Sequence, residues 1–188
     1  LWYSITNNKE GKHTMVENYT DVMADICANL AEHTLPRWKE LPDLPLYMDQ
    51  VLGLIGRYLG SYPGADDKGL TASMVNNYVK LGVMPPPIKK RYTREHLAHL
   101  IIICLLKPCL PIASIEKLIT NELSVRSIED VYDHFCDTFE KTNRTAAASV
   151  LNETDAPSPL FPVYRLALQA QAEQALARKL FAVCFSPE

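Results

Sequence analysis

The sequence has no apolar run that is long enough to cross a membrane. Its longest run, residues 100–106, falls far short of the ~20 residues that a membrane-spanning helix needs. The five cysteines are scattered and odd in number, which favours reduced thiols over a disulfide framework. Glycine-rich phosphate loops and strand–turn–helix nucleophile motifs are missing as well. We therefore expect a cytoplasmic, non-enzymatic protein without catalytic residues, metal, cofactor or membrane segment.

A global excess of basic charge is also missing, because the formal net charge is -3 at pH 7. The charges are nevertheless unevenly distributed, since no Asp or Glu occurs between residues 70 and 94. The cations of this window are Lys80, Lys89, Lys90, Arg91 and Arg94. One basic patch on an otherwise acidic chain is typical of a protein that approaches a polyanion through one face.

Alternating runs of β-branched residues are almost absent, whereas apolar residues recur at helical spacing along most of the chain. The sequence therefore predicts an all-α fold. The expected parts are a flexible N-terminal arm over residues 1–14, a helical domain over 15–142, a linker over 143–159 and a C-terminal helix over 160–188. Helices within the domain are expected at 16–31, 46–59, 70–81 and 93–107, with two more beginning at Pro111 and Ser127.

The expected helix over residues 70–81 has two distinct faces. Its apolar residues are predicted to point inward, and they are Leu70, Met74, Tyr78 and Leu81. Its outward stripe contains no acid, and it consists of Ser73, Asn76, Asn77 and Lys80. Asn binds the adenine edge through paired hydrogen bonds, and Lys reaches guanine or phosphate. The stripe fits a helix that enters the major groove, although any amphipathic helix has a solvated polar face.

A proline-rich basic segment follows this helix. Three consecutive prolines at 85–87 force an extended backbone that leads into Lys89, Lys90 and Arg91. Such a rigid loop is suited to hold the phosphate backbone beside a groove, and a solvated charge run is the alternative. Tyr92 either contacts the nucleic acid or anchors the loop in the core, and Arg94 is a further candidate phosphate ligand.

The order of these elements resembles the winged helix-turn-helix of MerR-type regulators. The shared motifs are Tyr78, Lys80-Leu81-Gly82, Pro85–Pro87, Arg91-Tyr92 and the helix start at Thr93. The wider stretch 35–123 is most similar to the uncharacterised bacterial domain-of-unknown-function family 1836, itself considered MerR-like. The resemblance implies a winged helix-turn-helix core over about residues 46–123, with N- and C-terminal helices added to it.

The resemblance is incomplete in the expected recognition helix. MerR-type helices carry an arginine and two aromatic residues where this chain has Asn76-Asn77-Tyr78, so only Tyr78 carries over as a DNA ligand. The usual arginine–phosphate contact is therefore not implied. A long coiled coil between subunits is not evident either, so activation by promoter untwisting is not implied.

Two functional hypotheses follow. The first is a sequence-specific transcriptional regulator that binds double-stranded DNA through a helix-turn-helix and a basic wing. The second is a non-enzymatic protein–protein interaction module on the same scaffold, which the net acidity and the missing arginine favour.

The C-terminal helix bears on the oligomeric state. Its apolar residues recur every four positions, as Leu168, Ala172, Leu176, Leu180 and Cys184. This stripe either packs on its own domain or pairs with a second copy, and a homodimer would supply the symmetry of a palindromic operator.

Two residue pairs have the chemistry of metal ligands. Cys104 and Cys109 lie five positions apart, and His96 and His99 lie three apart on one expected helix. No His pair lies near the cysteines at ligand spacing, so we predict a structural role for them. Glu95 neighbours the two histidines, but a helix start beside a basic loop is expected simply to expose such residues.

Overall fold

The computed structural model describes residues 9–60, 69–152, 158 and 160–185. Over these residues the fold is all-α, as predicted, and contains no strand. The elements are α1 (Lys9–Glu32), the 3₁₀ turn η1 (Trp38–Glu40), α2 (Met48–Leu59), α3 (Ala72–Lys80), α4 (Arg94–Leu106), α5 (Ile112–Leu123), α6 (Ile128–Leu151) and α7 (Phe161–Cys184). None of the described helices is both long and apolar enough to span a membrane.

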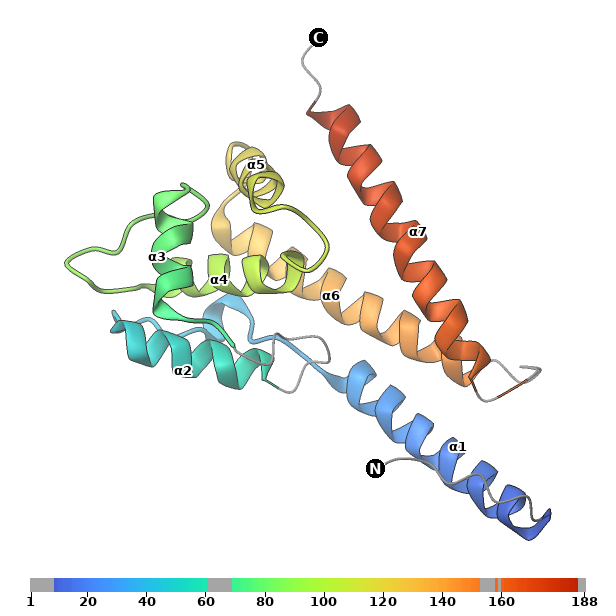
Figure 1. Cartoon of the computed structure of the whole chain (residues 1–188). Coiled ribbons are helices and arrows are strands. Elements are labelled where there is room, and N and C mark those ends of the chain that lie inside the picture. Colours follow the sequence, from blue (N-terminus) through green and yellow to red (C-terminus); the bar gives the residue numbers. More distant parts are fainter. Residues whose placement is uncertain (1–8, 61–68, 153–157, 159, 186–188) are drawn as a thin grey trace.

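Helix α4 is the centre of the main core. All residues from His96 to Ile103 are buried, so the helix needs neighbours on every side. It packs against α2, α5 and α6, and Figure 1 shows α2 on one side of it and α5 on the other. The partners bury Val51 from α2, Ile115 from α5 and Tyr132 from α6 in the same core.

The proline-containing segment between α1 and α2 is fastened to α6. The backbone N–H of Trp38 donates to the Asp133 carboxylate at 2.8 Å. The Arg37 guanidinium forms ion pairs with Asp137 at 2.8 Å and with Glu140 at 2.9 Å. These contacts fix the position from which the chain enters α2.

Helices α1 and α6 pack against each other away from the main core (Figure 1). Cys27, Ala147 and Val150 form a second small cluster there, and Leu166 of α7 packs against it. Pro162 is the one buried residue of α7. Most of α7 therefore lies on the surface, as its separation from α6 in Figure 1 shows.

The predicted domain boundaries need two corrections. Residues 143–151 belong to α6 rather than to a linker, because Asn143, Ala147 and Val150 are buried and alanine is the best helix former. Residues 9–14 belong to α1 rather than to a flexible arm. The rest of the predicted arm, part of the linker (153–157 and 159) and residues 61–68 between α2 and α3 lie outside the described residues.

Candidate nucleic-acid interface

Helix α3 presents the polar stripe that its sequence predicts. Thr71 caps the helix, since its Oγ1 accepts a hydrogen bond from the Met74 N–H at 3.3 Å. Val75 is fully buried against the main core. The four predicted surface residues are all exposed, namely Ser73, Asn76, Asn77 and Lys80. Helix α3 therefore offers an acid-free face of amide, hydroxyl and ammonium groups.

The end of α3 is set by glycine. Gly82 has a φ of 74°, and its N–H donates to the Val79 carbonyl at 3.1 Å. The Val83 N–H donates to the Tyr78 carbonyl at 3.0 Å, which completes a Schellman motif. Val83 is buried, whereas Leu81 is 48% exposed. The inward orientation predicted for Leu81 is thus wrong, because the helix ends before it and Val83 occupies the core instead.

Tyr78 belongs to the core and not to the surface. Its side chain is buried with that of Val75, on the side of α3 away from Asn76. A duplex lying against the exposed face of α3 would not reach it. This corrects the expectation, taken from the resemblance, that Tyr78 is a DNA ligand.

The basic segment forms a two-residue hairpin. Ile88 and Arg91 exchange backbone hydrogen bonds of 3.1 and 2.9 Å, so Lys89 and Lys90 occupy the turn between them. Both lysines have positive φ, 50° and 62°, as in a type I′ turn. This left-handed conformation costs about 1 kcal/mol or more for each non-glycine residue. We call Ile88–Arg91 the basic hairpin.

The base of the basic hairpin is anchored on both sides. Tyr92 exchanges backbone hydrogen bonds of 2.8 and 2.9 Å with Leu46, and its ring packs edge-on against His96. Tyr92 is buried, and burial raises the pKa of its hydroxyl. Of the two roles considered for Tyr92, the structure supports the anchor, which corrects its assignment as a DNA ligand.

His96 connects the hairpin to α4. Its Nδ1 accepts a hydrogen bond from the Thr93 N–H at 3.0 Å, so the proton of the neutral ring resides on Nε2. Nε2 then faces the Pro86 carbonyl at 3.4 Å. His96 thus holds the proline segment against the first turn of α4.

The two arginines between residues 70 and 94, Arg91 and Arg94, differ in whether their guanidinium groups are free to bind a phosphate. Arg94 is held in the protein, since its Nε donates to the Leu41 carbonyl at 3.0 Å and its guanidinium lies 3.5 Å from the Asp43 carboxylate. This corrects the assignment of Arg94 as a phosphate ligand. The Arg91 guanidinium lies 3.5 Å above the Tyr47 ring and donates to its hydroxyl. Arg91 is half-buried, and it remains at the surface beside the lysines.

Tyr47 was not predicted from the sequence. Its position 44 residues before Arg91 gives no local signal, and the contact arises because the Leu46–Tyr92 bridge brings the two segments together. The exposed side chain of Ile88, beside the two lysines, was not predicted either.

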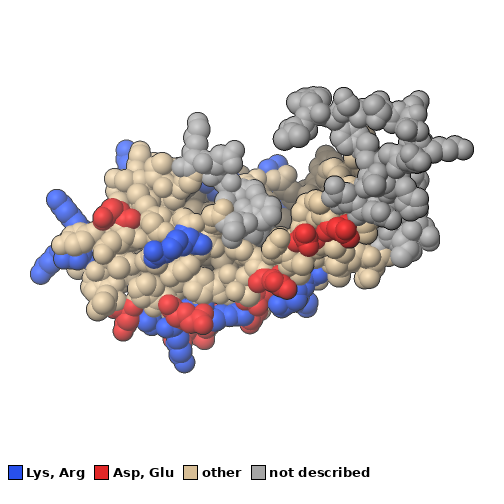
Figure 2. Space-filling model, turned by 90° about the horizontal axis from the view of Figure 1, so that it is seen from below, with Lys and Arg blue, Asp and Glu red and all other residues tan. Residues whose placement is uncertain are grey.

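Helix α3 and the basic hairpin lie at the same end of the molecule, away from α1 and α7 (Figure 1). The outermost charged side chains at this end are basic (Figure 2). The exposed cations of these two elements are Lys80, in the last turn of α3, and Lys89 and Lys90, in the turn of the basic hairpin. A polar helix face and a cationic turn therefore occur at the same end of the molecule.

The candidate metal ligands do not converge. The Nδ1–H of His99 donates to the Glu95 carbonyl at 2.8 Å, and burial lowers the pKa of this ring. Burial also raises the pKa of the Cys104 thiol to about 11, whereas Cys109 is exposed. Within the described ranges no three His, Cys, Asp or Glu side chains gather as potential metal ligands.

Comparison with known proteins assigns the region that contains α3 and the basic hairpin to a family. A family model described as Domain of unknown function (DUF1836) matches residues 36–135, which run from the segment before α2 to the first turns of α6. Comparison with curated proteins and with solved structures gave no match. Both α3 and the basic hairpin lie within the matched region, and the match spans more than half of the chain. This protein therefore belongs to the DUF1836 family.

Proposed function

We propose that this protein binds double-stranded DNA and acts as a transcriptional regulator. Helix α3 is the recognition helix of a winged helix-turn-helix formed with α2, and the basic hairpin is the wing. The observation that carries the proposal is an exposed, acid-free helix face at the same end of the molecule as the exposed Lys89-Lys90 turn. Base edges would be read by α3, and the wing would hold phosphates.

The backbone of the wing supports a binding role. A hairpin of this length favours Asn-Gly in its turn, and lysine has no conformational advantage there. Strained residues persist where the surrounding structure holds them, and they cluster at functional sites. Here the bridge from Tyr92 to Leu46 and the His96 contacts hold the turn. Because lysine has no conformational advantage in this turn, we attribute the two lysines to their charge, which would bind an anionic partner.

The reading face has no arginine. Asn76 and Asn77 can each pair with an adenine through two hydrogen bonds, and Ser73 can contact several bases. Lys80 lies at the last turn of α3 and can reach guanine or phosphate. Base specificity would therefore depend on the side-chain amides of Asn76 and Asn77, and affinity would depend on the lysines.

Salt dependence tests the proposal. The protein would be titrated into a pool of fluorescein-labelled random duplexes, with anisotropy read from ~50 to ~200 mM salt, where phosphate-driven binding weakens steeply. Lys89→Ala with Lys90→Ala should lower the slope of log K against log salt by about 1.8, because each lost phosphate contact contributes about 0.9. The charge-matched control, Lys117→Ala with Lys141→Ala on α5 and α6, should leave the slope unchanged.

Two results would overturn this function. The first is failure of the wild-type protein to bind any duplex at ~50 mM salt. The second is an equal change in the slope of log K against log salt for the hairpin double variant and for the control double variant. In the first case the surface serves the alternative role, that of a protein–protein interaction module, which the net charge of -3 favours. Selection of duplexes from the same pool should enrich adenine-containing sites, and Asn76→Ala with Asn77→Ala should abolish the enrichment while preserving the slope.

We further propose that the regulator is a homodimer formed through α7. This helix carries apolar side chains around its circumference, yet Pro162 is its one buried residue. Leu168, Leu176, Leu180 and Val183 are all more than half exposed. A helix that is apolar on several faces is normally covered, and a second copy supplies a cover of matching chemistry.

A further inference from the structure

Tyr47, Arg91 and Ile88 form a row of side chains on the solvent side of the hairpin. Leu46 and Tyr92 exchange backbone hydrogen bonds as an antiparallel pair, and both of their side chains pack in the core. The next residues along the two segments, Tyr47 and Arg91, therefore lie opposite each other and point to the other face. Arg91 also pairs with Ile88 across the hairpin. Tyr47 and Ile88 are accordingly 50% and 67% exposed.

The backbone of Tyr47 is held in place where α2 begins. Its N–H donates to the side-chain oxygen of Gln50 at 2.9 Å, and its carbonyl accepts a hydrogen bond from the Val51 N–H at 3.0 Å. The central carbon of the Arg91 guanidinium lies 3.5 Å from the centre of the Tyr47 ring. One N–H of the guanidinium also donates to the Tyr47 hydroxyl. The ring and the hydroxyl thus restrict a side chain that would otherwise sample many rotamers.

Tyr47 holds Arg91 without neutralising its charge. Arg94 differs in this respect, because its guanidinium lies 3.5 Å from the carboxylate of Asp43. Among the described residues no carboxylate comes within ion-pair distance of Arg91, and Asp49 in the first turn of α2 does not reach it. The Tyr47 hydroxyl is also the one hydrogen-bond partner of the Arg91 side chain among these residues. The remaining N–H donors of this half-buried group carry a full positive charge and are available to an anion.

The geometry of a stacked guanidinium favours phosphate as that anion. An aromatic ring covers a face of the guanidinium plane, whereas the N–H donors point along the plane and match two oxygens of a phosphate. A guanidinium that is already held in place also loses less entropy when it binds. The exposed Lys89 and Lys90 immediately precede Arg91 in the chain, which favours a polymer of phosphates over a single free ion.

We infer that Tyr47 is a positioning residue, which holds the Arg91 guanidinium ready to bind a phosphodiester group of the DNA backbone. The inference rests on the proposed function and adds to it a residue at the start of α2. The wing would hold the backbone through Lys89 and Lys90 in its turn and through Arg91 at its base. Phosphate binding would then connect the wing to α2, because the ring that orients Arg91 belongs to that helix start.

The charge of Arg91 is tested with the duplex pool and the salt titration described above. Arg91→Ala should lower the slope of log K against log salt by about 0.9, the contribution of one phosphate contact. Arg91→Lys should keep the slope but weaken binding roughly threefold, because an ammonium group is bound less well by the ring and cannot bridge two phosphate oxygens. The charge-matched control, Arg144→Ala on the exposed side of α6, should bind like the wild-type protein.

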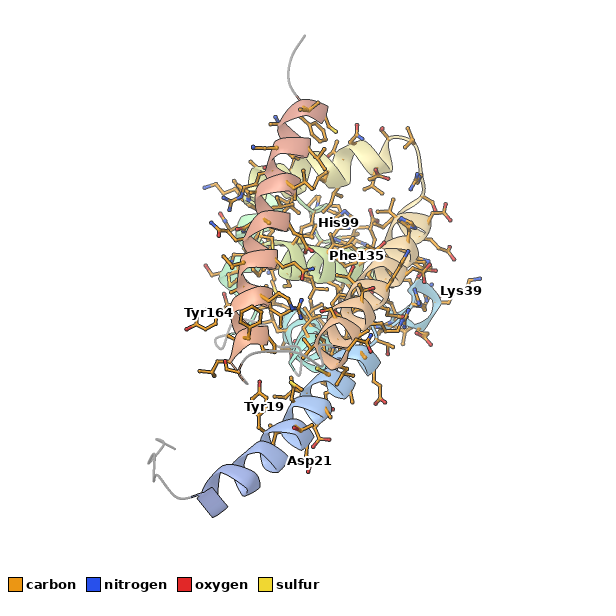
Figure 3. All side chains as sticks on the ribbon, turned by 90° about the vertical axis from the view of Figure 1, so that its right-hand side faces the viewer. Tyr19, Asp21, Lys39, His99, Phe135 and Tyr164 are labelled. Atoms are coloured by element: carbon orange, nitrogen blue, oxygen red, sulfur yellow. The ribbon has the colours of Figure 1, made fainter. Side chains whose placement is uncertain are left out.

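The role of Tyr47 is tested by variants that change no charge. Tyr47→Leu removes the ring and the hydroxyl, and should weaken duplex binding roughly 3- to 10-fold. Tyr47→Phe keeps the ring over the guanidinium and should weaken binding less. Tyr164 supplies the control, since it is 66% exposed and projects from α7 (Figure 3). Tyr164→Leu should have the affinity of the wild-type protein.

A double-variant cycle separates positioning from other roles of the ring. In a protein that already carries Arg91→Ala, Tyr47→Leu should cause no further loss of affinity, because Tyr47 acts through Arg91. Equal weakening with and without Arg91 would overturn the inference. Urea denaturation of Tyr47→Leu completes the test. A lower urea midpoint together with wild-type affinity would identify Tyr47 as a purely structural residue, and would also overturn the inference.

The inference and the proposed function fail in different ways. An unchanged salt slope for Arg91→Ala, while Lys89→Ala with Lys90→Ala still lowers the slope, would overturn the inference alone. A wild-type protein that binds no duplex at ~50 mM salt would overturn both.

Discussion

The hydroxyl of Tyr132 donates a hydrogen bond of 2.8 Å to the carbonyl oxygen of Pro36, 96 positions earlier in the chain. Tyr132 is completely buried, so its hydroxyl has no access to water as an alternative partner. The bond fixes the segment before α2 onto α6. That segment also carries Leu46, which is bridged to Tyr92 at the base of the basic hairpin. The position of the basic hairpin thus depends on a series of contacts that begins at α6.

Removal of the Tyr132 hydroxyl should destabilise the fold. We expect Tyr132→Phe to lower the free energy of unfolding by about 1–3 kcal/mol, the cost of an unsatisfied buried group. Urea denaturation measures the change. Tyr164→Phe removes an exposed hydroxyl from α7 and should stay within about 0.5 kcal/mol of wild type. Equal stability of both variants would contradict the role given to this bond.

Substitution of Arg94 should affect stability and not DNA binding. Arg94→Met removes the hydrogen bond to Leu41 and the pairing with Asp43, and should lower the free energy of unfolding by about 1–2 kcal/mol. The salt slope for duplex binding should not change, because the guanidinium is occupied within the protein. A slope reduced as in Lys89→Ala with Lys90→Ala would instead identify Arg94 as a phosphate ligand.

Relief of backbone strain in the basic hairpin should change the stability of the fold and the affinity for DNA in opposite directions. Lys89→Asn with Lys90→Gly suits the turn, so thermal unfolding should show a gain of about 1 kcal/mol or more. Duplex affinity should fall as in Lys89→Ala with Lys90→Ala, which removes the same charges and keeps the strain. A fall in stability would show that the lysines adopt this turn without strain.

Burial of His99 predicts a dependence of stability on pH. Burial lowers the pKa of His99 from its ordinary value of 6.5, so the unfolded chain binds a proton more readily than the folded protein does. This contribution to stability is complete above pH 6.5 and is lost as pH falls below it, by at most about 1.4 kcal/mol per pH unit. Urea midpoints from pH 8 to pH 5 should therefore fall less steeply for His99→Gln than for wild type.

The exposed residue His134 supplies the control for this measurement. His134→Gln should show the pH dependence of the wild-type protein, because replacing an exposed ring leaves the buried one in place. A His99→Gln protein with the wild-type steepness would place the titrating group elsewhere.

Local patterns predicted the helices and the exposed face of α3. The stripe from Ser73 to Lys80 is visible because helical spacing separates it from Val75 and Tyr78 without knowledge of any other segment. Gly82 likewise marks the end of α3 through its own conformational freedom. Such features depend on neighbours within one or two turns.

Long-range contacts account for most of what the sequence could not predict. In the sequence, Arg94 cannot be distinguished from the neighbouring cations. Its hydrogen bond to the Leu41 carbonyl and its ion pair with Asp43 form only when the chain has folded. Residues 143–151 look polar and small, and they are helical because α1 packs against them. The role of Tyr78 illustrates the opposite case: its helical position already indicated burial, and the resemblance to MerR-type proteins led to the incorrect surface assignment.

The continuity of α6 determines where a fragment of this protein can be cut. The family match ends at Phe135, yet α6 continues to Leu151 without interruption. A fragment ending at residue 135 would lack Cys136 of the main core and both carboxylates that bind Arg37, namely Asp137 and Glu140. It would therefore leave the segment before α2 poorly fastened, although every residue of α3 and the hairpin was retained. A fragment that is expressed to study α3 and the basic hairpin should accordingly extend to Leu151, the end of α6, beyond the boundary of sequence similarity.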